Sequence, residues 1–221
     1  MYTKLSNTLL LPLVLVGIIV GCSGPEKATT LKEGVWRGTL NVQGNELPFN
    51  FEIVNNNGQY RAYLNNAEEH LLLDAIAITG DSVYIPMHIF DADIKAVIDD
   101  KKLKGAWKKN YYDDYVIPFE AEHDQSYRFE SASSSPTQDF SGSWDMEFDH
   151  DGDTTVGIAI LKQIDERLTG TIITPAGDYR YLEGQVEGDQ LMLSTFDGGH
   201  AFLFKATASE DGLQGDFLSG K

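Results

Sequence analysis

Apolar and polar side chains alternate with a period of two in both halves of this 221-residue chain. Such alternation is typical of β-strands that turn one face toward a core and the other toward water. The first half shows it over residues 47–53, where leucine, phenylalanine and isoleucine alternate with proline, asparagine and glutamate. The second half shows a weaker version over residues 156–160, where valine and isoleucine alternate with small residues. Both segments are predicted to be strands.

Turn signals separate the predicted strands. Glycine beside asparagine or aspartate recurs between the apolar segments, and this combination favours tight hairpin turns. The signals fall at Asn57-Gly58, Gly80-Asp81, Asp151-Gly152, Gly177-Asp178, Asp197-Gly198 and Asp211-Gly212. After residue 21 no segment shows a long helical period, and the best candidate for a short helix is 92–100. The pattern therefore predicts an all-β fold built from antiparallel meanders.

The second half of the chain repeats the first. Four short motifs recur in the same order at offsets of 106 to 110 residues, and small changes in loop length would give this drift. The pairs are Gly34-Val35-Trp36 with Gly142-Ser143-Trp144, Gly80-Asp81 with Gly188-Asp189, Phe90-Asp91 with Phe196-Asp197, and Leu103 to Trp107 with Leu213 to Phe217. The repeat predicts two tandem β-modules, barrels or sandwiches, with Trp36 and Trp144 at equivalent buried positions.

The N-terminus has the features of a bacterial lipoprotein signal peptide. Lys4 supplies the positive charge, residues 9–20 an apolar stretch too short to span a bilayer, and Ile19-Val20-Gly21-Cys22 the site of cleavage and lipidation. We therefore expect acylation of Cys22, which would hold the protein on a membrane of the cell envelope, facing the periplasm or the cell exterior. Cys22 is the only cysteine, so no disulfide can form within the chain.

These signals divide the chain into a signal peptide (1–21), a lipid-anchored tether (22–32), module 1 (33–129), a linker (130–139) and module 2 (140–221). The linker is polar and serine-rich with one proline. Module 1 has a strand-like segment after Trp107, whereas only four residues follow Phe217 in module 2. We therefore expect module 2 to be incomplete in this chain, lacking about ten residues of strand and turn. An open edge of that kind favours association with other chains.

Acidic residues dominate the mature chain, which has 200 residues with 16 basic and 34 acidic side chains. Nucleic-acid binding depends on clustered lysine and arginine, so the composition argues against a nucleic-acid partner. The same charge repels an anionic membrane surface, which leaves the lipid on Cys22 as the expected membrane contact.

Motifs for metal binding are weak. The acidic segment 149–154 resembles the start of a calcium loop, but Thr154 occupies the glycine position and Ile160 stands where a bidentate glutamate is needed. A hairpin turn is the better interpretation. The histidines share no metal-ligand spacing; they are His70, His88, His123, His150 and His200. We expect no metal-binding or cofactor-binding residue.

Motifs for catalysis are equally few, and we expect no catalytic residue in this chain. No serine lies in a nucleophile elbow, and no glycine-rich loop precedes a helix. Asp197 and His200 could form an acid–base pair, or they could belong to a turn that leads into the segment 201–204. The turn is the favoured interpretation.

Aromatic residues are plentiful: Trp36, Trp107 and Trp144, with a cluster at Tyr111, Tyr112 and Tyr115. Rings at alternate strand positions either fill a core or line a ligand cavity. The sequence leaves this choice open, because it depends on whether the interior of each module is full.

The Gly-x-Trp motif at the start of each module resembles the beginning of lipocalin and avidin-like barrels, in which the tryptophan plugs one end. Together with the lipobox and the segments 47–51, 66–69 and 196–204, the arrangement resembles the N-terminal β-rich region of membrane-anchored thiol-disulfide oxidoreductases of the TlpA/ResA type. In that family the activity belongs to a Cys-x-x-Cys pair on a thioredoxin domain. This chain has no such pair. The resemblance implies a place in envelope redox maintenance, as an anchor, spacer or client-recognition module.

Three functions are therefore open. The leading expectation is a lipid-anchored, non-catalytic β-module associated with an envelope thiol-disulfide oxidoreductase, with an envelope protein as its client. The second is lipocalin-like binding of a small apolar ligand, indicated by Gly34 to Trp36 and Gly142 to Trp144. The third is an enzyme that uses His200 and nearby carboxylates.

Overall fold

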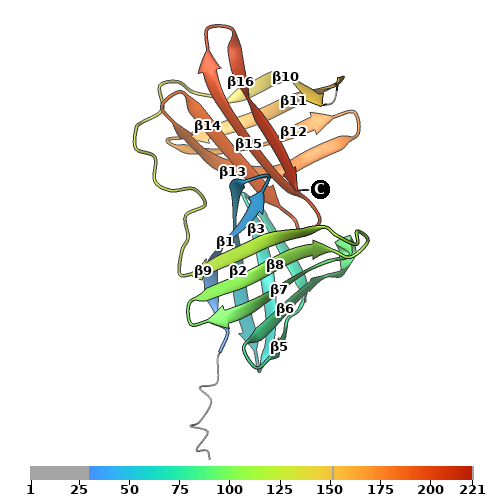
Figure 1. Cartoon of the computed structure of the whole chain (residues 1–221). Coiled ribbons are helices and arrows are strands. Elements are labelled where there is room, and N and C mark those ends of the chain that lie inside the picture. Colours follow the sequence, from blue (N-terminus) through green and yellow to red (C-terminus); the bar gives the residue numbers. More distant parts are fainter. Residues whose placement is uncertain (1–29, 151, 221) are drawn as a thin grey trace, which may run out of the picture.

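The computed structural model describes residues 30–150 and 152–220, and within them every side chain except those of His150 and Arg180. Cys22 and the predicted signal peptide lie outside the described residues. The described chain forms two antiparallel β-sheets, each curled into a barrel-like module, and the two modules are stacked (Figure 1). The prediction of an all-β fold with two tandem antiparallel modules is confirmed. In the described part of the chain, no helix has the length and apolar character needed to cross a membrane.

Module 1 is a nine-stranded sheet in the order β4-β3-β2-β1-β9-β8-β7-β6-β5. Its last strand, β9, pairs with β8 on one side and with β1 on the other, which joins the end of the module to its beginning. The short strand β5 continues the path of β4 after a break at Ile76. The strands are β1 (Gly34–Val42), β2 (Asn45–Asn56), β3 (Gln59–Asn66), β4 (Glu69–Ala75), β5 (Ala77–Thr79), β6 (Ser82–Met87), β7 (Ala92–Asp99), β8 (Lys102–Lys109) and β9 (Val116–His123).

Module 2 is a seven-stranded meander whose strands pair in chain order. Its end strands, β10 and β16, each have one pairing partner, β11 and β15 respectively. The strands are β10 (Gly142–His150), β11 (Asp153–Ile164), β12 (Arg167–Thr174), β13 (Gly177–Glu187), β14 (Gln190–Phe196), β15 (Ala201–Ser209) and β16 (Gly212–Gly220).

The repeated motifs occupy equivalent positions in the two modules. The indole Nε1 of Trp36 donates a hydrogen bond to the carbonyl of Lys32, 3.0 Å away, and Nε1 of Trp144 donates to the carbonyl of Phe140 at 2.9 Å. Each acceptor lies four residues before its tryptophan. The same equivalence relates β1 to β10 and β8 to β16.

A pair of glycines supports the second equivalence. A Cβ on Gly105 of β8 would lie 1.9 Å from the carbonyl oxygen of Lys95, and a Cβ on Gly215 of β16 would lie 1.8 Å from that of Lys205. In both modules the neighbouring strand therefore passes too close for a side chain. Glycine is required at both places for the same steric reason.

The expected short helix at 92–100 is wrong. This segment is the strand β7, in which Ala92, Ile94, Ala96 and Ile98 point into the core of module 1. Alanine at two of the inward positions made the period-two pattern hard to distinguish from a short helical segment. The 3-10 helix η1 (His88–Phe90) lies just before this strand.

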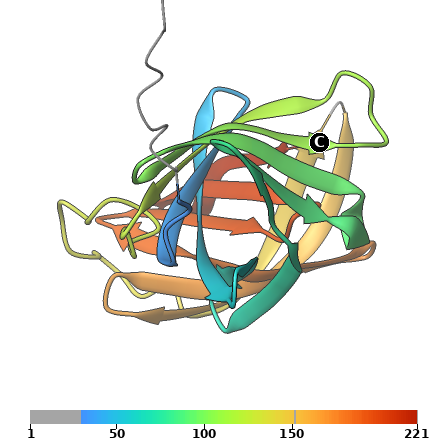
Figure 2. The same ribbon diagram turned by 90° about the horizontal axis from the view of Figure 1, so that it is seen from below.

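One end of the module 1 barrel is covered by module 2. Phe196, Ala201 and Leu203, from the β14–β15 hairpin, belong to the buried core of module 1. The ring of Phe196 lies 4.5 Å from the ring of Phe49 and 5.3 Å from that of Trp107, measured between centroids. Phe202 and Phe204, on the opposite face of β15, pack into module 2. The β14–β15 hairpin therefore contributes side chains to the cores of both modules. The view along the stack shows it lying across the module 1 barrel (Figure 2).

Arg128, which follows β9 and precedes the linker in the chain, is buried and contacts both modules. The guanidinium of Arg128 donates hydrogen bonds to the carbonyl of Asn65 in module 1 and to the carbonyl and hydroxyl of Ser194 in module 2. Its Nη2 lies 3.5 Å from a carboxylate oxygen of Glu183. Burial lowers the pKa of Arg128 to about 10, opposed by the charge of Glu183. The side chain is charged at neutral pH and holds strands of both modules.

The segment 130–139 has no regular secondary structure and runs along the β13–β14 hairpin. The amide of Thr137 donates to the carbonyl of Gly188 at 2.8 Å, and Gln185 donates to the carbonyl of Glu130 at 2.7 Å. The predicted linker is thus a connection that packs on module 2.

Candidate functional site: an open barrel cavity in module 2

Module 2 contains an apolar cavity of about 480 Å³ between its two end strands. Trp144, Met146 and Phe148 of β10 form one wall, and Leu213 and Phe217 of β16 form the opposite wall. The floor comes from Ala159, Leu161, Ile172, Leu191, Leu193 and Phe204 of the intervening strands. Volumes of this size are typical of sites for small ligands or for a few side chains of a partner.

The cavity is open because no described strand joins β10 to β16. In module 1, the equivalent residues Trp36, Leu40, Leu103 and Trp107 are buried beneath β9. In module 2, their counterparts Trp144, Phe148, Leu213 and Phe217 are half-buried. The prediction that both tryptophans are buried is therefore right for Trp36 and wrong for Trp144. Trp144 is only half-buried because no described strand covers this side of the barrel.

Aromatic rings line the inner end of this cavity. Phe217 stacks on Phe204 with 4.6 Å between ring centroids, and Phe148 lies 5.3 Å from Phe217. Tyr179 contacts the same group from β13, with its ring perpendicular to that of Phe202 at 4.7 Å. Burial raises the pKa of Tyr179, so its hydroxyl is neutral at physiological pH. The inward-facing side chains of β10 and β16 are uncharged and suit an apolar guest, and the cavity lining also includes the charged residues Asp145, Glu147, Lys205, Asp211 and Asp216.

Carboxylates surround the opening. Asp145 and Glu147 lie on the outer face of β10, and Asp216 lies on the outer face of β16. Within the described residues none of the three forms an ion pair. Lys205 stands opposite Asp216 in the β15–β16 pairing, but its ammonium donates to the side-chain oxygen of Asn45 in module 1. The rim of the cavity is therefore acidic.

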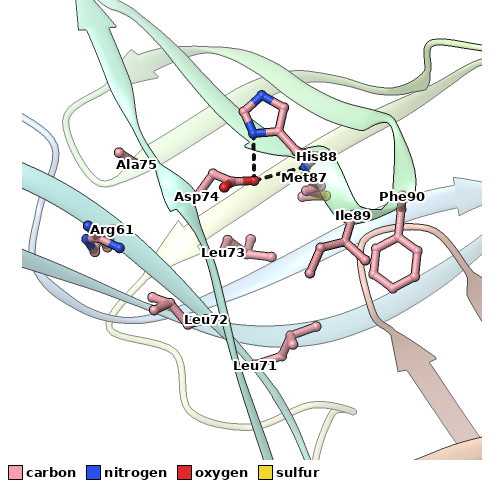
Figure 3. A pocket seen from close by; sticks show the side chains of 10 residues that line it. All are labelled: Arg61, Leu71, Leu72, Leu73, Asp74, Ala75, Met87, His88, Ile89 and Phe90. Carbon is pink, nitrogen blue, oxygen red and sulfur yellow. Dashed lines mark hydrogen bonds and ion pairs between the residues drawn. The ribbon is translucent and has the colours of Figure 1, made fainter.

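A second hollow lies on module 1 and is lined by residues of β3, β4, β6 and η1 (Figure 3). Leu71, Leu73 and Ile89 give it an apolar floor and edge, and Ile89 is 81% exposed. The amide of His88 donates to Asp74 Oδ2 at 2.9 Å, and Nδ1 of its ring lies 3.0 Å from the same oxygen. These contacts lower the pKa of Asp74, the backbone hydrogen bond being the largest cause. They hold η1 against β4.

Asp197 and His200 form the turn between β14 and β15. Asp197 Oδ1 accepts hydrogen bonds from the amides of Gly199 and His200, at 2.8 and 2.7 Å, and Oδ2 lies 2.9 Å from Nδ1 of His200. Burial alone would raise the pKa of Asp197, but these hydrogen bonds and the charge of His200 lower it. Both carboxylate oxygens of Asp197 thus contact groups within the turn, which agrees with the favoured interpretation of this segment as a turn.

The two glycines of this turn make room for module 1. A Cβ on Gly199 would lie 2.5 to 2.7 Å from the ring and Cβ of Phe90, and one on Gly198 would lie 3.0 Å from the sulfur of Met87. The carbonyl of Gly198 accepts a hydrogen bond from Nε1 of Trp107 at 3.0 Å. Trp107 of module 1 is therefore hydrogen-bonded to the backbone of module 2. The sequence repeat did not predict this contact.

The tyrosine cluster is a packed group on the connection between β8 and β9. The rings of Tyr111 and Tyr112 lie 4.7 Å apart, and Tyr115 packs perpendicular to Trp107 at 6.1 Å. Burial raises the pKa of Tyr115 to about 12. The buried ammonium of Lys109 lies over the rings of Trp107 and Tyr115. These aromatic residues pack against module 1.

The remaining candidates stand apart from one another. Where β10 meets β11, His150 stands opposite Asp153, the hydroxyl of Thr154 donates to Asp149, and Gly152 has a φ of 89°. His70 stacks on Tyr63, and His123 contacts the carbonyl of Glu33. Among the described residues, no group of three histidine, cysteine, aspartate or glutamate side chains could hold a metal ion.

The cavity was only partly visible in the sequence. Trp144, Leu213 and Phe217 stood out through the repeat, but Met146 in the wall and Phe204 in the floor did not. Comparisons with protein-family models, with curated proteins and with solved structures give no match for this chain.

Proposed function

We propose that this chain is a lipid-anchored, non-catalytic binding module of the bacterial cell envelope, and that the open cavity of module 2 is its binding site. The proposal combines the lipobox at Cys22 with the geometry of module 2. The observation that carries it is the half-exposed apolar lining: large side chains that are buried in module 1 face solvent in module 2. Exposed apolar surface of this extent is typical of a site that is covered by a guest.

The chemistry of the cavity favours an apolar guest without negative charge. Leucine, phenylalanine and tryptophan side chains contribute the lining, and burying them gains roughly 25 cal/mol per Å². The acidic rim disfavours a fatty acid or another anion. Specific polar groups inside the cavity are few, so shape and hydrophobicity determine what fits.

Binding of a neutral fluorescent probe tests the site. N-phenyl-1-naphthylamine should bind to the purified protein with increased fluorescence and with energy transfer from tryptophan. Met146→Lys places a charge on the inner face of β10 and should weaken binding at least tenfold. Glu166→Lys, in the exposed β11–β12 turn and outside the cavity lining, is the control with an added lysine and should leave binding of this neutral probe unchanged. Equal binding by both variants would show that the probe does not enter this cavity.

Association with an envelope thiol-disulfide oxidoreductase is a separate prediction that rests on the resemblance alone. Its test is the reading frame beyond Lys221: a Cys-x-x-Cys domain there would support it. A Cys22→Ser variant tests the anchor, because it should no longer incorporate labelled palmitate. Continued labelling of this variant would contradict lipidation at Cys22.

A further inference from the structure

The space between β10 and β16, here called the strand slot, corresponds to the position of β9 in module 1. β10 is the counterpart of β1, and β16 is the counterpart of β8, by motif and by backbone contact. In module 1 a single strand, β9, pairs with both β1 and β8. The described residues of module 2 place no strand in the equivalent position. The repeat therefore shows what kind of segment the strand slot accommodates.

The inner face of β9 shows that a strand in this position needs apolar side chains pointing into the barrel. Ile117, Phe119 and Ala121 point inward and are buried. Phe119 packs against Phe49 and Phe51 of β2, with centroid distances of 6.2 and 6.4 Å. In module 2 the corresponding interior is the cavity bounded by Met146, Phe148 and Phe217. A strand in the slot would fill this cavity with every second side chain.

The outer face of β9 shows that the charges of a strand in this position are opposite to those of the strands on either side. Glu120 and Glu122 lie 2.7 and 3.7 Å from the ammonium groups of Lys104 and Lys102 on β8. On the other side, Glu122 stands opposite Arg37 of β1. The strands that flank β9 are therefore basic where β9 is acidic.

In module 2 the sign of these flanking charges is reversed. The position of Arg37 is occupied by Asp145, and that of Thr39 by Glu147. On β16, Gln214 replaces Lys104, and Asp216 adds a carboxylate on the outer face. The described residues of β10 and β16 include no lysine or arginine. A strand in the slot would meet carboxylates on both sides.

We propose that the strand slot binds an extended segment of a partner polypeptide in which large apolar residues alternate with lysine or arginine. This inference rests on the proposed function and names the class of guest for the same cavity. The backbone of the segment would pair with the free edges of β10 and β16, and such main-chain pairing supplies affinity in strand addition. The alternate side chains would supply specificity, apolar ones to the cavity and basic ones to the rim.

Three synthetic peptides test the proposal directly. The first has the sequence of β9 with Glu120→Lys and Glu122→Lys; the second is unmodified β9; the third contains the residues of the first in an order without alternation. The first peptide should bind the purified protein about tenfold more tightly than the second at low salt, because each exposed charge pair contributes modestly. This preference should shrink at high salt. The third peptide should not bind.

Charge-reversed protein variants sharpen the test. Asp145→Lys with Glu147→Lys should invert the preference, so that the unmodified β9 peptide binds more tightly. Asp178→Lys with Glu166→Lys changes the net charge equally on segments that do not flank the strand slot, and should keep the original preference. Both pairs of positions are exposed, so folding should be preserved. Hydrogen exchange should show new protection in β10 and β16 when the first peptide is bound.

The outcomes separate this inference from the proposed function. Binding of the naphthylamine probe without binding of any peptide would leave the cavity as a small-molecule site and overturn the strand proposal. Failure of both the probe and the peptides would overturn the proposed function as well. Self-association of the protein with protection confined to β10 and β16 would show that a second copy occupies the slot, and would overturn the proposal. A longer natural form of the protein in which residues after Lys221 form the strand between β10 and β16 would overturn it as well. Equal binding of the first two peptides would overturn the proposed preference for lysine or arginine in the partner segment.

Discussion

The two modules share a strand plan but differ in how their interiors are enclosed. In module 1, β9 joins the last strand of the meander to the first, and the β14–β15 hairpin of the other module covers one end. In module 2 the end strands have no described strand between them. The same inward positions are consequently core in one module and cavity lining in the other. Burial is thus decided by neighbouring strands, and the residues themselves do not determine it.

The largest expected difference between the modules concerns their equivalent tryptophans. Trp36→Ala should lower the free energy of unfolding by about 3–5 kcal/mol, because a fully buried indole is removed. Trp144→Ala should cost only about 1–2 kcal/mol, because part of the indole is already in water. Urea unfolding of the two variants measures both values. Equal losses would mean that Trp144 is as enclosed as Trp36, and the contrast between the modules would fail.

The next effect concerns the coupling of the modules. Arg128→Ala should cost about 2–3 kcal/mol, because buried acceptors in both modules lose a charged donor. The thermal transition should also separate into two, with module 2 unfolding first. Arg167→Ala is the matched control: Arg167 pairs with the same Glu183 but is half-exposed, so its loss should cost less than about 1 kcal/mol. A single unshifted transition for Arg128→Ala would show that the modules are coupled elsewhere.

A smaller effect is expected at the glycine contact between the modules. Gly199→Ala adds a methyl group against Phe90 and should cost about 1–3 kcal/mol through local displacement. Glu210→Ala, at the exposed tip of the β15–β16 hairpin, should change stability by less than about 0.5 kcal/mol. Calorimetry of both variants provides the measurement. If Gly199→Ala were as stable as the unmodified protein, the close approach of the β14–β15 turn to η1 would be wrong.

The smallest effect depends on pH. The pKa of Asp197 is lowered in the folded protein, so its contribution to stability is present above the ordinary aspartate range and is lost as pH falls through the lowered folded value. Asp197→Asn should therefore destabilise the protein by about 0.5–1 kcal/mol at pH 7. The difference from the unmodified protein should shrink below pH 3.8, the ordinary aspartate value. A difference that grows under acid conditions would contradict the assigned sign.

Much of the fold was predictable because it depends on local patterns. The alternation at 47–53 lies within β2 with its apolar side chains buried, and the repeated motifs placed the two modules correctly. The segment 156–160 is indeed a strand, part of β11, but the expected inward face is wrong: Val156, Ile158 and Ile160 are exposed, and the small residue Ala159 points into the core. Turn glycines marked the hairpins. The prediction for 92–100 was wrong because alanine fits a helix as well as a strand, and only pairing with β6 and β8 decides between them.

The cavity and the contact between the modules could not be predicted in the same way. Met146 and Phe148 look like core residues in the sequence, and they line an opening only because no described strand pairs with the second edge of β10. The segment 201–204 contained a signal that pattern analysis did not use: it is apolar on both faces, as expected for a strand buried on both sides. Its second face belongs to module 1, a contact between distant segments that periodicity does not encode.

Phe196 and Leu203 complete the core of a module that precedes them in the chain by many residues. Proteins are synthesised from the N-terminus, and early domains usually fold as they emerge from the ribosome. Here the first barrel emerges with Phe49 and Trp107 uncovered at one end, and the residues that cover them lie in β14 and β15, close to the end of the described chain. The first module therefore cannot complete its core until the β14–β15 hairpin has been synthesised, and a chain interrupted before residue 196 should leave its barrel open at one end and sensitive to proteolysis.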